Sequence, residues 1–230
     1  MKFHGFQKMT MLDYPGRVAC TLFTAGCNFR CPFCHNAPLV TQVTENDIHT
    51  EEEILAYLNK RRGIIDGVCI TGGEPLLQPE LPSFIQKVKA LGLKVKLDTN
   101  GYNPTALRAL IDANLLDYVA MDIKNCSARY GETVGVSNFD ITPILDSISL
   151  LREGRVSYEF RTTVVPEFHT AKDLEELAKM IEGDSPYFLQ QFVDSGCVIE
   201  SNLHAYAPGA MRELLEIVKK YVTNAQLRGV

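Results

Sequence analysis

The stretch RVACTLFTAGCNFRCPFCHNAP, residues 17–38, decides the fold. Its opening, RVACTLFT, is a β-rich and uninterrupted run of the kind that forms a buried parallel strand. The loop that follows holds three of the chain's seven cysteines, Cys27, Cys31 and Cys34, at C-x3-C-x2-C spacing. No fourth cysteine lies nearby in the sequence, so a metal group held by these three thiols would keep an open coordination position.

Outward from this stretch, the chain alternates short apolar runs with amphipathic ones, in about six β-then-α units. Such alternation predicts a parallel sheet with right-handed crossovers. Six units fall short of the eight that close a TIM barrel, so we expect an α/β fold that forms an open, partial (β/α)6 barrel. The 230 residues show no linker or repeat, which favours one domain over residues 1–230. Further strands are expected at 65–71, 93–99, 117–124, 156–166 and 186–193, and helices at 50–63, 79–92, 104–115, 139–154, 170–183 and 209–222.

Composition excludes several classes of function. The net charge of −5 offers no electrostatic footprint for nucleic acid. No run reaches the ~18 apolar residues that span a bilayer, so no membrane association is expected. The opening residues lack a signal-peptide core, and an odd cysteine count without a small-domain disulfide framework fits a reducing compartment. We therefore expect a cytoplasmic protein.

Polar and glycine-rich residues stand where the predicted strands end. TGGEP (71–75) follows the second predicted strand, DTNG (98–101) the third and DIK (122–124) the fourth, while Arg161 lies within the fifth. Parallel sheets place ligand chemistry at the carboxyl ends of their strands. These residues and the cysteine loop are therefore expected to converge on one site.

Three clustered cysteines are compatible with more than one metal group. Cys31–His35 matches the C-x-x-C-H signature of haem attachment, but no export signal accompanies it. A Cys3His zinc site with His35 would need the adjacent Cys34 and His35 on one tetrahedral centre, which is awkward. A [4Fe–4S] cluster usually takes four cysteines, so three would leave one iron open to a substrate or cofactor. A zinc- or haem-binding module without catalysis is the alternative from another class.

The cysteine spacing, with the aromatic Phe33 before the last cysteine and GGE about forty residues later, resembles the radical S-adenosylmethionine (radical SAM) superfamily over nearly the whole chain. The resemblance implies a cluster loop at 25–36, a [4Fe–4S] cluster on Cys27, Cys31 and Cys34, and S-adenosylmethionine on the open iron. It further implies reductive cleavage of this cofactor to a 5′-deoxyadenosyl radical. The cofactors carry that chemistry, and the protein positions them.

The other strand-end residues suit that ligand. Gly72 and Gly73 would let backbone approach its methionine end, where Glu74 would accept from the ammonium, so Gly73→Val is expected to weaken cofactor binding while sparing iron. The resemblance implies a monovalent-cation site at Asp98, Thr99 and Asp122, and contacts of Lys124 and Arg161 with the methionine end. Phe33, facing adenine, and His35 complete the expected cofactor contacts.

Several further stretches resemble the glycyl-radical-enzyme activating proteins. These are DYPG (13–16), CHN (34–36), LDTNG (97–101), MDIK (121–124), GVSN (135–138) and RTTVVP (161–166). The resemblance implies an oxidoreductase that takes hydrogen from a backbone glycine of a partner glycyl radical enzyme, with a flavodoxin- or ferredoxin-type electron donor. The compact branch that activates anaerobic ribonucleoside-triphosphate reductase is most similar, and a pyruvate formate-lyase activase, another activase or a radical enzyme with a small-molecule or peptide substrate are the alternatives. Val193 stands where the lyase activase has a cofactor-binding histidine in its sixth strand.

Other cysteines and histidines are assigned no chemistry. We expect Cys20, Cys69, Cys126 and Cys197 to be small buried hydrophobic residues. His4, His49, His169 and His204 have no paired ligand in the sequence.

Overall fold

The computed structural model describes residues 1–44, 48–194 and 196–230. The strands are β1 (Lys2–Phe3), β2 (Gly5–Thr10), β3 (Ala19–Thr24), β4 (His49–Thr50), β5 (Gly67–Gly72), β6 (Lys94–Thr99), β7 (Tyr118–Asp122), β8 (Ser157–Val164), β9 (Tyr187–Gln191) and β10 (Ala225–Arg228). The α-helices are α1 (Ala37–Thr41), α2 (Glu51–Lys60), α3 (Leu81–Ala90), α4 (Pro104–Asp112), α5 (Tyr130–Val134), α6 (Thr142–Arg152), α7 (Ala171–Met180) and α8 (Pro208–Val218). Short 3-10 turns span Pro75–Leu77 and Ser127–Arg129.

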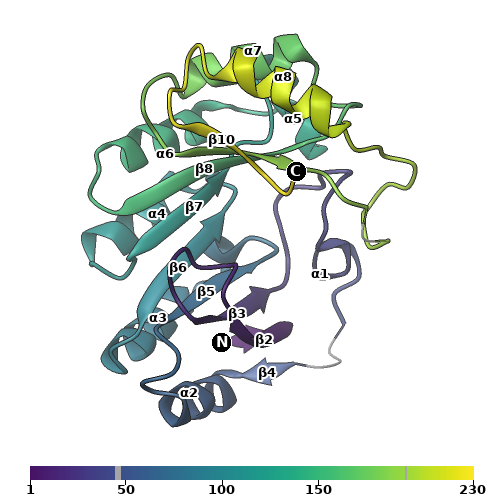
Figure 1. The fold of residues 1–230 in the computed structure, drawn as a ribbon. Helices are drawn as coiled ribbons and strands as arrows, with labels where there is room; N and C mark the ends of the chain where they lie inside the picture. The colour runs from purple at the N-terminus through teal and green to yellow at the C-terminus, as the bar shows by residue number, and fades with distance from the viewer. Residues whose placement is uncertain (45–47, 195) are drawn as a thin grey trace.

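A curved sheet with the order β10-β9-β8-β7-β6-β5-β3-β2 forms the centre of the molecule (Figure 1). The six strands predicted from the sequence are β3 and β5 to β9, and they pair in parallel throughout. The predicted open α/β barrel is therefore confirmed. Two edge strands were not predicted: β10 adds to β9 in parallel, and β2 adds to β3 in antiparallel orientation.

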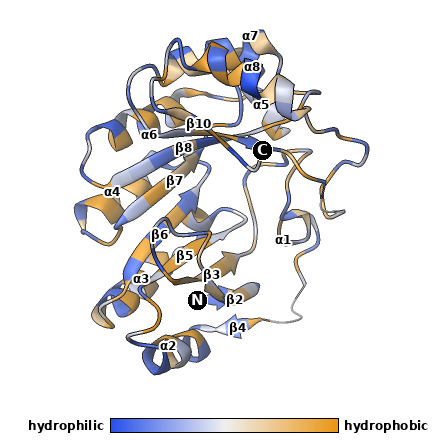
Figure 2. Cartoon of the chain, in the orientation of Figure 1, coloured by the Kyte–Doolittle hydropathy of each residue, from blue (hydrophilic) through white to orange (hydrophobic). Residues whose placement is uncertain are grey.

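The longer helices cover the convex side of this sheet, and the concave side opens toward α1 and the cysteine loop (Figure 1). Helix starts follow capping chemistry: the Thr50 hydroxyl accepts from the Glu53 backbone, and Thr170 and Asp173 form a reciprocal capping box at α7. The hydrophobic residues of the strands alternate with polar ones, and the covering helices carry both hydrophobic and hydrophilic residues (Figure 2). This arrangement buries the sheet on its convex side and leaves the strand ends free for polar residues.

The DYPG stretch closes the amino-terminal end of the barrel. Tyr14 is buried there, and a Cβ on Gly67 at the start of β5 would lie 2.9 Å from its ring. Asp13 accepts a 2.5 Å hydrogen bond from the Thr21 hydroxyl in β3. This motif therefore packs against the amino-terminal ends of the strands and lies away from the carboxyl ends that carry the polar residues.

The unassigned cysteines behave in two ways. Cys20, Cys69 and Cys126 are buried, as expected for small hydrophobic residues. Cys197 is exposed, so the expectation of burial is wrong there: residues 196–202 around it are exposed or half-buried. Across the described ranges, no helix has the length and apolar character that crossing a membrane requires.

Candidate active site

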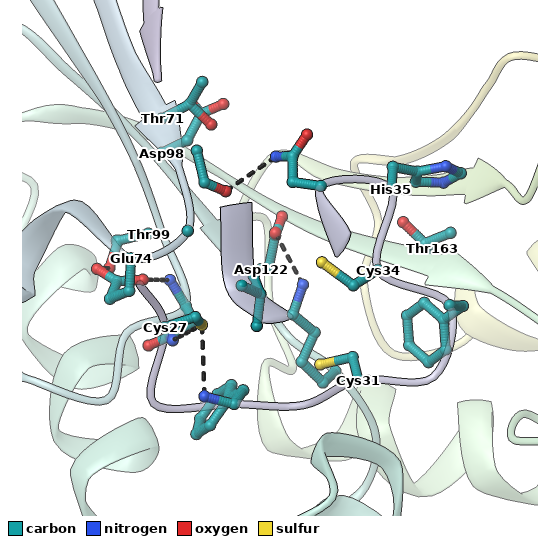
Figure 3. Close-up of a pocket in the computed structure, with 18 of the residues that line it drawn as sticks. Cys27, Cys31, Cys34, His35, Thr71, Glu74, Asp98, Thr99, Asp122 and Thr163 are labelled. Carbon is teal, nitrogen blue, oxygen red and sulfur yellow. Dashed lines mark hydrogen bonds and ion pairs between the residues drawn. The ribbon is translucent and has the colours of Figure 1, made fainter. Parts of the chain in front are cut away.

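The carboxyl ends of β5 to β9 and the cysteine loop surround one cavity of about 230 Å³ (Figure 3). All thirteen residues singled out in the sequence line it: Cys27, Cys31, Phe33, Cys34, His35, Gly72, Gly73, Glu74, Asp98, Thr99, Asp122, Lys124 and Arg161. The lining also includes Phe29, Asn36, Val40, Thr71, Asn100, Thr163 and Gln190, which were not singled out as site residues. The expected convergence of strand ends is therefore present in the fold.

The cysteine loop is tied to the barrel by backbone hydrogen bonds along its length. Gly26 N–H donates to the Leu39 carbonyl at 2.8 Å, and Arg30 N–H donates to the Val134 carbonyl at 2.8 Å. The GVSN motif explains the second contact, because Gly135 ends α5 with a φ of 66° and a Cβ there would lie 2.9 Å from the Arg30 carbonyl oxygen. The loop thus holds its three thiols against the cavity through specific anchors.

The spread of the thiols distinguishes between metal groups. In the part of the chain that the structure describes, no three His, Cys, Asp or Glu side chains approach closely enough to hold one metal ion. A zinc site needs its ligands on one centre, whereas the cysteines of an iron–sulfur cluster bind different irons and lie around a larger group. The donor set therefore fits a cluster with one open iron better than the Cys3His zinc alternative.

Burial keeps two of these thiols protonated before a metal group arrives. It raises the pKa of Cys27 above its ordinary value and raises that of Cys31 to about 12. The nearby Lys124 ammonium opposes the shift at both thiols without cancelling it. Binding of iron therefore releases protons from the loop.

The glycine pair packs against the cysteine loop and the end of β3. A Cβ on Gly73 would lie 1.9 Å from the Gly26 carbonyl oxygen, and one on Gly72, whose φ is +117°, would lie 2.3 Å from the Thr24 carbonyl oxygen. The space that these glycines leave is filled by the cysteine loop and the end of β3. This contact argues against the expectation that Gly73→Val spares iron, because a side chain there would push the cluster loop away.

Glu74 ties two strand ends together. Its carboxylate accepts from Leu76 N–H at 3.1 Å, from the Thr99 hydroxyl at 2.7 Å and from Asn100 N–H at 2.7 Å. The residue is only 2% exposed, and burial raises its pKa to about 7 despite these donors. Its carboxylate thus holds the start of the loop after β6 through hydrogen bonds. Its contact with a cofactor ammonium stays a prediction.

A chain of alternating charges crosses the ends of β6, β7 and β8. Lys96 pairs with Asp98, Arg161 reaches Asp98 at 3.3 Å and Asp122 at 2.9 Å, and Lys124 reaches Asp122 at 2.9 Å. Burial alone would raise the pKa of Asp122, but Arg161 and Lys124 outweigh it and hold that pKa at about 2. Of these side chains, Lys96 lies behind the lining, while Lys124 and Arg161 line the cavity together with the carboxylates Asp98, Asp122 and Glu74.

The predicted cation site gains no support from this arrangement. Asp98 and Asp122 already have cationic partners, and the Thr99 hydroxyl is engaged with Glu74 at 2.7 Å. A monovalent cation at these residues stays a prediction from the resemblance.

The aromatic side chains brace the loop. Phe33 is buried between the rings of Phe168 and His169, at centroid distances of 5.6 and 5.9 Å, and His35 stacks on Phe192 at 5.5 Å. His169 accepts from Val165 N–H at Nδ1 (3.1 Å) and donates from Nε2 to the Lys124 carbonyl (2.7 Å). The sequence gave no role to His169. In the structure its neutral imidazole packs against Phe33 and so supports the cysteine loop.

Gln190 of β9 lines the cavity close to the position at which the lyase activase has its cofactor-binding histidine. Val193, which aligns with the missing histidine, is 63% exposed and does not line the cavity, whereas Gln190 does. Gln190 is paired in register with Thr163 of β8, which also lines the cavity. Within the described residues neither side chain has a hydrogen-bond partner, so both are free for a ligand. Their place near the carboxyl ends of the last two predicted strands was the available signal.

Comparison with known proteins places the chain. The family model described as radical SAM superfamily matches residues 21–181. A protein of Methanocaldococcus jannaschii named "Putative glycyl-radical enzyme activating enzyme" is 33% identical over 98% of this chain and 95% of its own length. The pyruvate formate-lyase-activating enzyme of Clostridium pasteurianum is 29% identical over 79% of this chain and 76% of its own.

Solved structures share the fold. The structure of SuiB from Streptococcus suis bound to S-adenosylmethionine superposes with a TM-score of 0.68 and 16% identity, over 90% of this chain. This chain spans about half of SuiB, 49% of its length. The chain therefore belongs to the radical SAM superfamily, whose members use a [4Fe–4S] cluster and S-adenosylmethionine, and it is a homologue of the glycyl-radical enzyme activating enzymes.

Proposed function

We propose that the protein installs a glycyl radical in a partner enzyme and that this partner is anaerobic ribonucleoside-triphosphate reductase. The observation that carries the proposal is the meeting of three cysteine thiols and the charged strand ends on one cavity. A relative named for glycyl-radical activation that matches 95% of its own length supports the same class of reaction.

The bound cofactors would supply a 5′-deoxyadenosyl radical that takes a hydrogen from a backbone glycine of the partner. Cys27, Cys31 and Cys34 would hold the cluster, and the cationic side chains of the cavity lining would bind the carboxylate of S-adenosylmethionine. Lys124 and Arg161 are the donors for that carboxylate. Their aspartate partners hold both cations at the strand ends before the ligand binds.

The cluster assignment is tested by three cysteine variants. Cys27→Ala, Cys31→Ala and Cys34→Ala should each abolish the formation of 5′-deoxyadenosine under dithionite, because each removes an iron ligand. Cys197→Ala is the matched control, since that thiol is exposed and lies outside the cavity lining. Wild-type cleavage by any of the three site variants would refute the assignment, and so would a colourless protein after anaerobic reconstitution with iron and sulfide.

The partner is tested by mixing reduced, cofactor-loaded protein with candidate glycyl radical enzymes. Anaerobic ribonucleoside-triphosphate reductase should develop a doublet electron paramagnetic resonance signal, and a variant with its radical glycine changed to alanine should not. The sequence also resembles pyruvate formate-lyase activases, and a relative of that name matches 79% of this chain, so pyruvate formate-lyase is the second candidate. A signal with the lyase alone would favour that partner. No signal with either, alongside normal cofactor cleavage, would refute both. The electron donor is expected to be a flavodoxin or ferredoxin.

A further inference from the structure

One cysteine of the loop differs from the other two in its hydrogen bonding. Cys27 Sγ accepts from Phe29 N–H at 3.3 Å and from the Asn100 side-chain amide at 3.8 Å. Over the described ranges of the chain, Sγ of Cys31 and Sγ of Cys34 accept no hydrogen bond. The three thiols are therefore placed in unequal surroundings before any metal group binds.

Asn100 is fixed so that its amino group faces Cys27. Its backbone N–H donates to Glu74 at 2.7 Å, and its Oδ1 accepts from Tyr102 N–H at 2.9 Å, which assigns the other side-chain atom as the amino nitrogen. That nitrogen also donates to Asn28 Oδ1 at 2.8 Å. Asn100 is buried, so its side chain has little freedom to turn away.

The contact joins three motifs that are far apart in the sequence. Glu74 belongs to TGGEP after β5, Asn100 to DTNG after β6, and Cys27 to the loop after β3. Glu74 acts through the Asn100 backbone, and Asn100 then reaches the sulfur atom. The GGE and DTNG motifs thus have a physical link to a cluster ligand as well as to the cavity.

We propose that Asn100 is a positioning residue that raises the reduction potential of the cluster by donating a hydrogen bond to the Cys27 thiolate. The proposal rests on Cys27 being a cluster ligand, as in the proposed function. Hydrogen bonds to ligand sulfurs are among the factors that set the potentials of iron–sulfur clusters. Reduction adds one negative charge to the cluster and its thiolates, so a donor at the sulfur stabilises the reduced state more than the oxidised state.

Loss of this donor should make the cluster harder to reduce. We expect the ratio of reduced to oxidised cluster, at a fixed solution potential, to fall about tenfold in Asn100→Leu, which for a one-electron couple equals about 59 mV. The measurement is a redox titration of the reconstituted protein without S-adenosylmethionine, followed by electron paramagnetic resonance. No partner enzyme or turnover is involved, so failure of the glycyl-radical proposal leaves the result unaffected.

Two aspartate variants distinguish loss of the hydrogen bond to Cys27 from a general disturbance of the loop. Asn100→Asp keeps the Oδ1 acceptor for Tyr102 but loses the donor, whereas Asn28→Asp adds the same charge beside Cys27 and leaves the Asn100 donor in place. The Asn100→Asp potential should lie below that of Asn28→Asp. Equal potentials in these two variants, or a wild-type potential in Asn100→Leu at full iron content, would overturn the proposal. Loss of iron in Cys27→Ala, measured separately, establishes the ligand on which the proposal depends.

Discussion

Replacing Gly73 by alanine should loosen the cluster loop. Gly73 has an ordinary backbone conformation, so the effect of an added Cβ comes from contact alone. That Cβ would lie 1.9 Å from the Gly26 carbonyl oxygen, and real Cβ contacts are essentially never shorter than 3.0 Å. Gly26 must therefore move by at least about 1 Å, and Gly26 directly precedes the ligand Cys27.

The cost follows from the hydrogen bonds at this contact. Gly73 N–H donates to Thr24 O and Glu74 N–H donates to Gly26 O, both at 2.8 Å. A shift of about 1 Å breaks both, at about 1 kcal/mol each, and strain in the loop brings the expected loss of stability to roughly 2–4 kcal/mol. Because the loop carries the thiols, iron content after reconstitution should fall together with cofactor affinity.

The assay pairs urea unfolding of the metal-free protein with iron analysis after anaerobic reconstitution. Gly209→Ala is the matched control, since Gly209 lies in α8 with open space around its Cβ position. That variant should keep its iron and be as stable as wild type or up to about 1 kcal/mol more stable. If Gly73→Ala binds a full complement of iron at wild-type stability, the glycine pair does not support the loop and the reasoning fails.

Three other predictions follow from the cavity lining. Gln190→Leu should weaken S-adenosylmethionine binding to the cluster-loaded protein about tenfold in equilibrium dialysis, and unchanged affinity would show that this free amide has no ligand. Burial lowers the pKa of His169, so its contribution to stability is full above the ordinary pKa of about 6.5 and is lost as pH falls. The difference in unfolding free energy between wild type and His169→Gln should therefore shrink from pH 8 to pH 5. A constant difference would contradict the role of a neutral His169 in supporting the loop. Ionised Asp122 stabilises the protein above its ordinary pKa, and this contribution is lost as pH falls through about 2. Arg161→Met should bring the folded-state pKa of Asp122 nearer its ordinary value and so reduce that contribution at neutral pH. The free energy of unfolding measured from pH 2 to 6 would show this change, and an unchanged pH profile would contradict the pairing.

The parallel core of the fold was predictable because its strands are buried on both faces. Runs such as residues 19–23 and 67–71 are apolar enough to stand out between amphipathic helices. The edge strands lacked that signal: β2 is largely exposed, and β10 has only four residues. Their pairing depends on a neighbouring strand that is already in place, so local sequence carries little information about it.

The position of the site was also predictable, but the contacts that its residues make with one another were less so. Strand-end location brought all thirteen residues to one cavity. The contact between Asn100 and Cys27 joins residues 73 positions apart, and no local pattern encodes its geometry. The contacts of the two glycines with the cysteine loop and β3 were not predictable for the same reason, because the sequence shows that a Cβ is absent but does not show which neighbour occupies its space.

The anchors of the cysteine loop bear on how the cluster is assembled. Gly73 and Glu74 hold the start of the loop, the Asn36 side chain donates to Gly72 O at 2.8 Å, and Glu200 N–H donates to Pro32 O at 2.9 Å. These bonds join protein groups and need no metal ligand, so we expect the loop to keep its place without iron, unlike a zinc finger that folds only on metal. Cluster assembly therefore gains little from folding and must release protons from thiols such as Cys31, whose pKa burial raises to about 12. An ordered loop favours assembly by lowering its entropic cost, while buried thiols oppose it, and the open cavity is what lets iron and sulfide reach them.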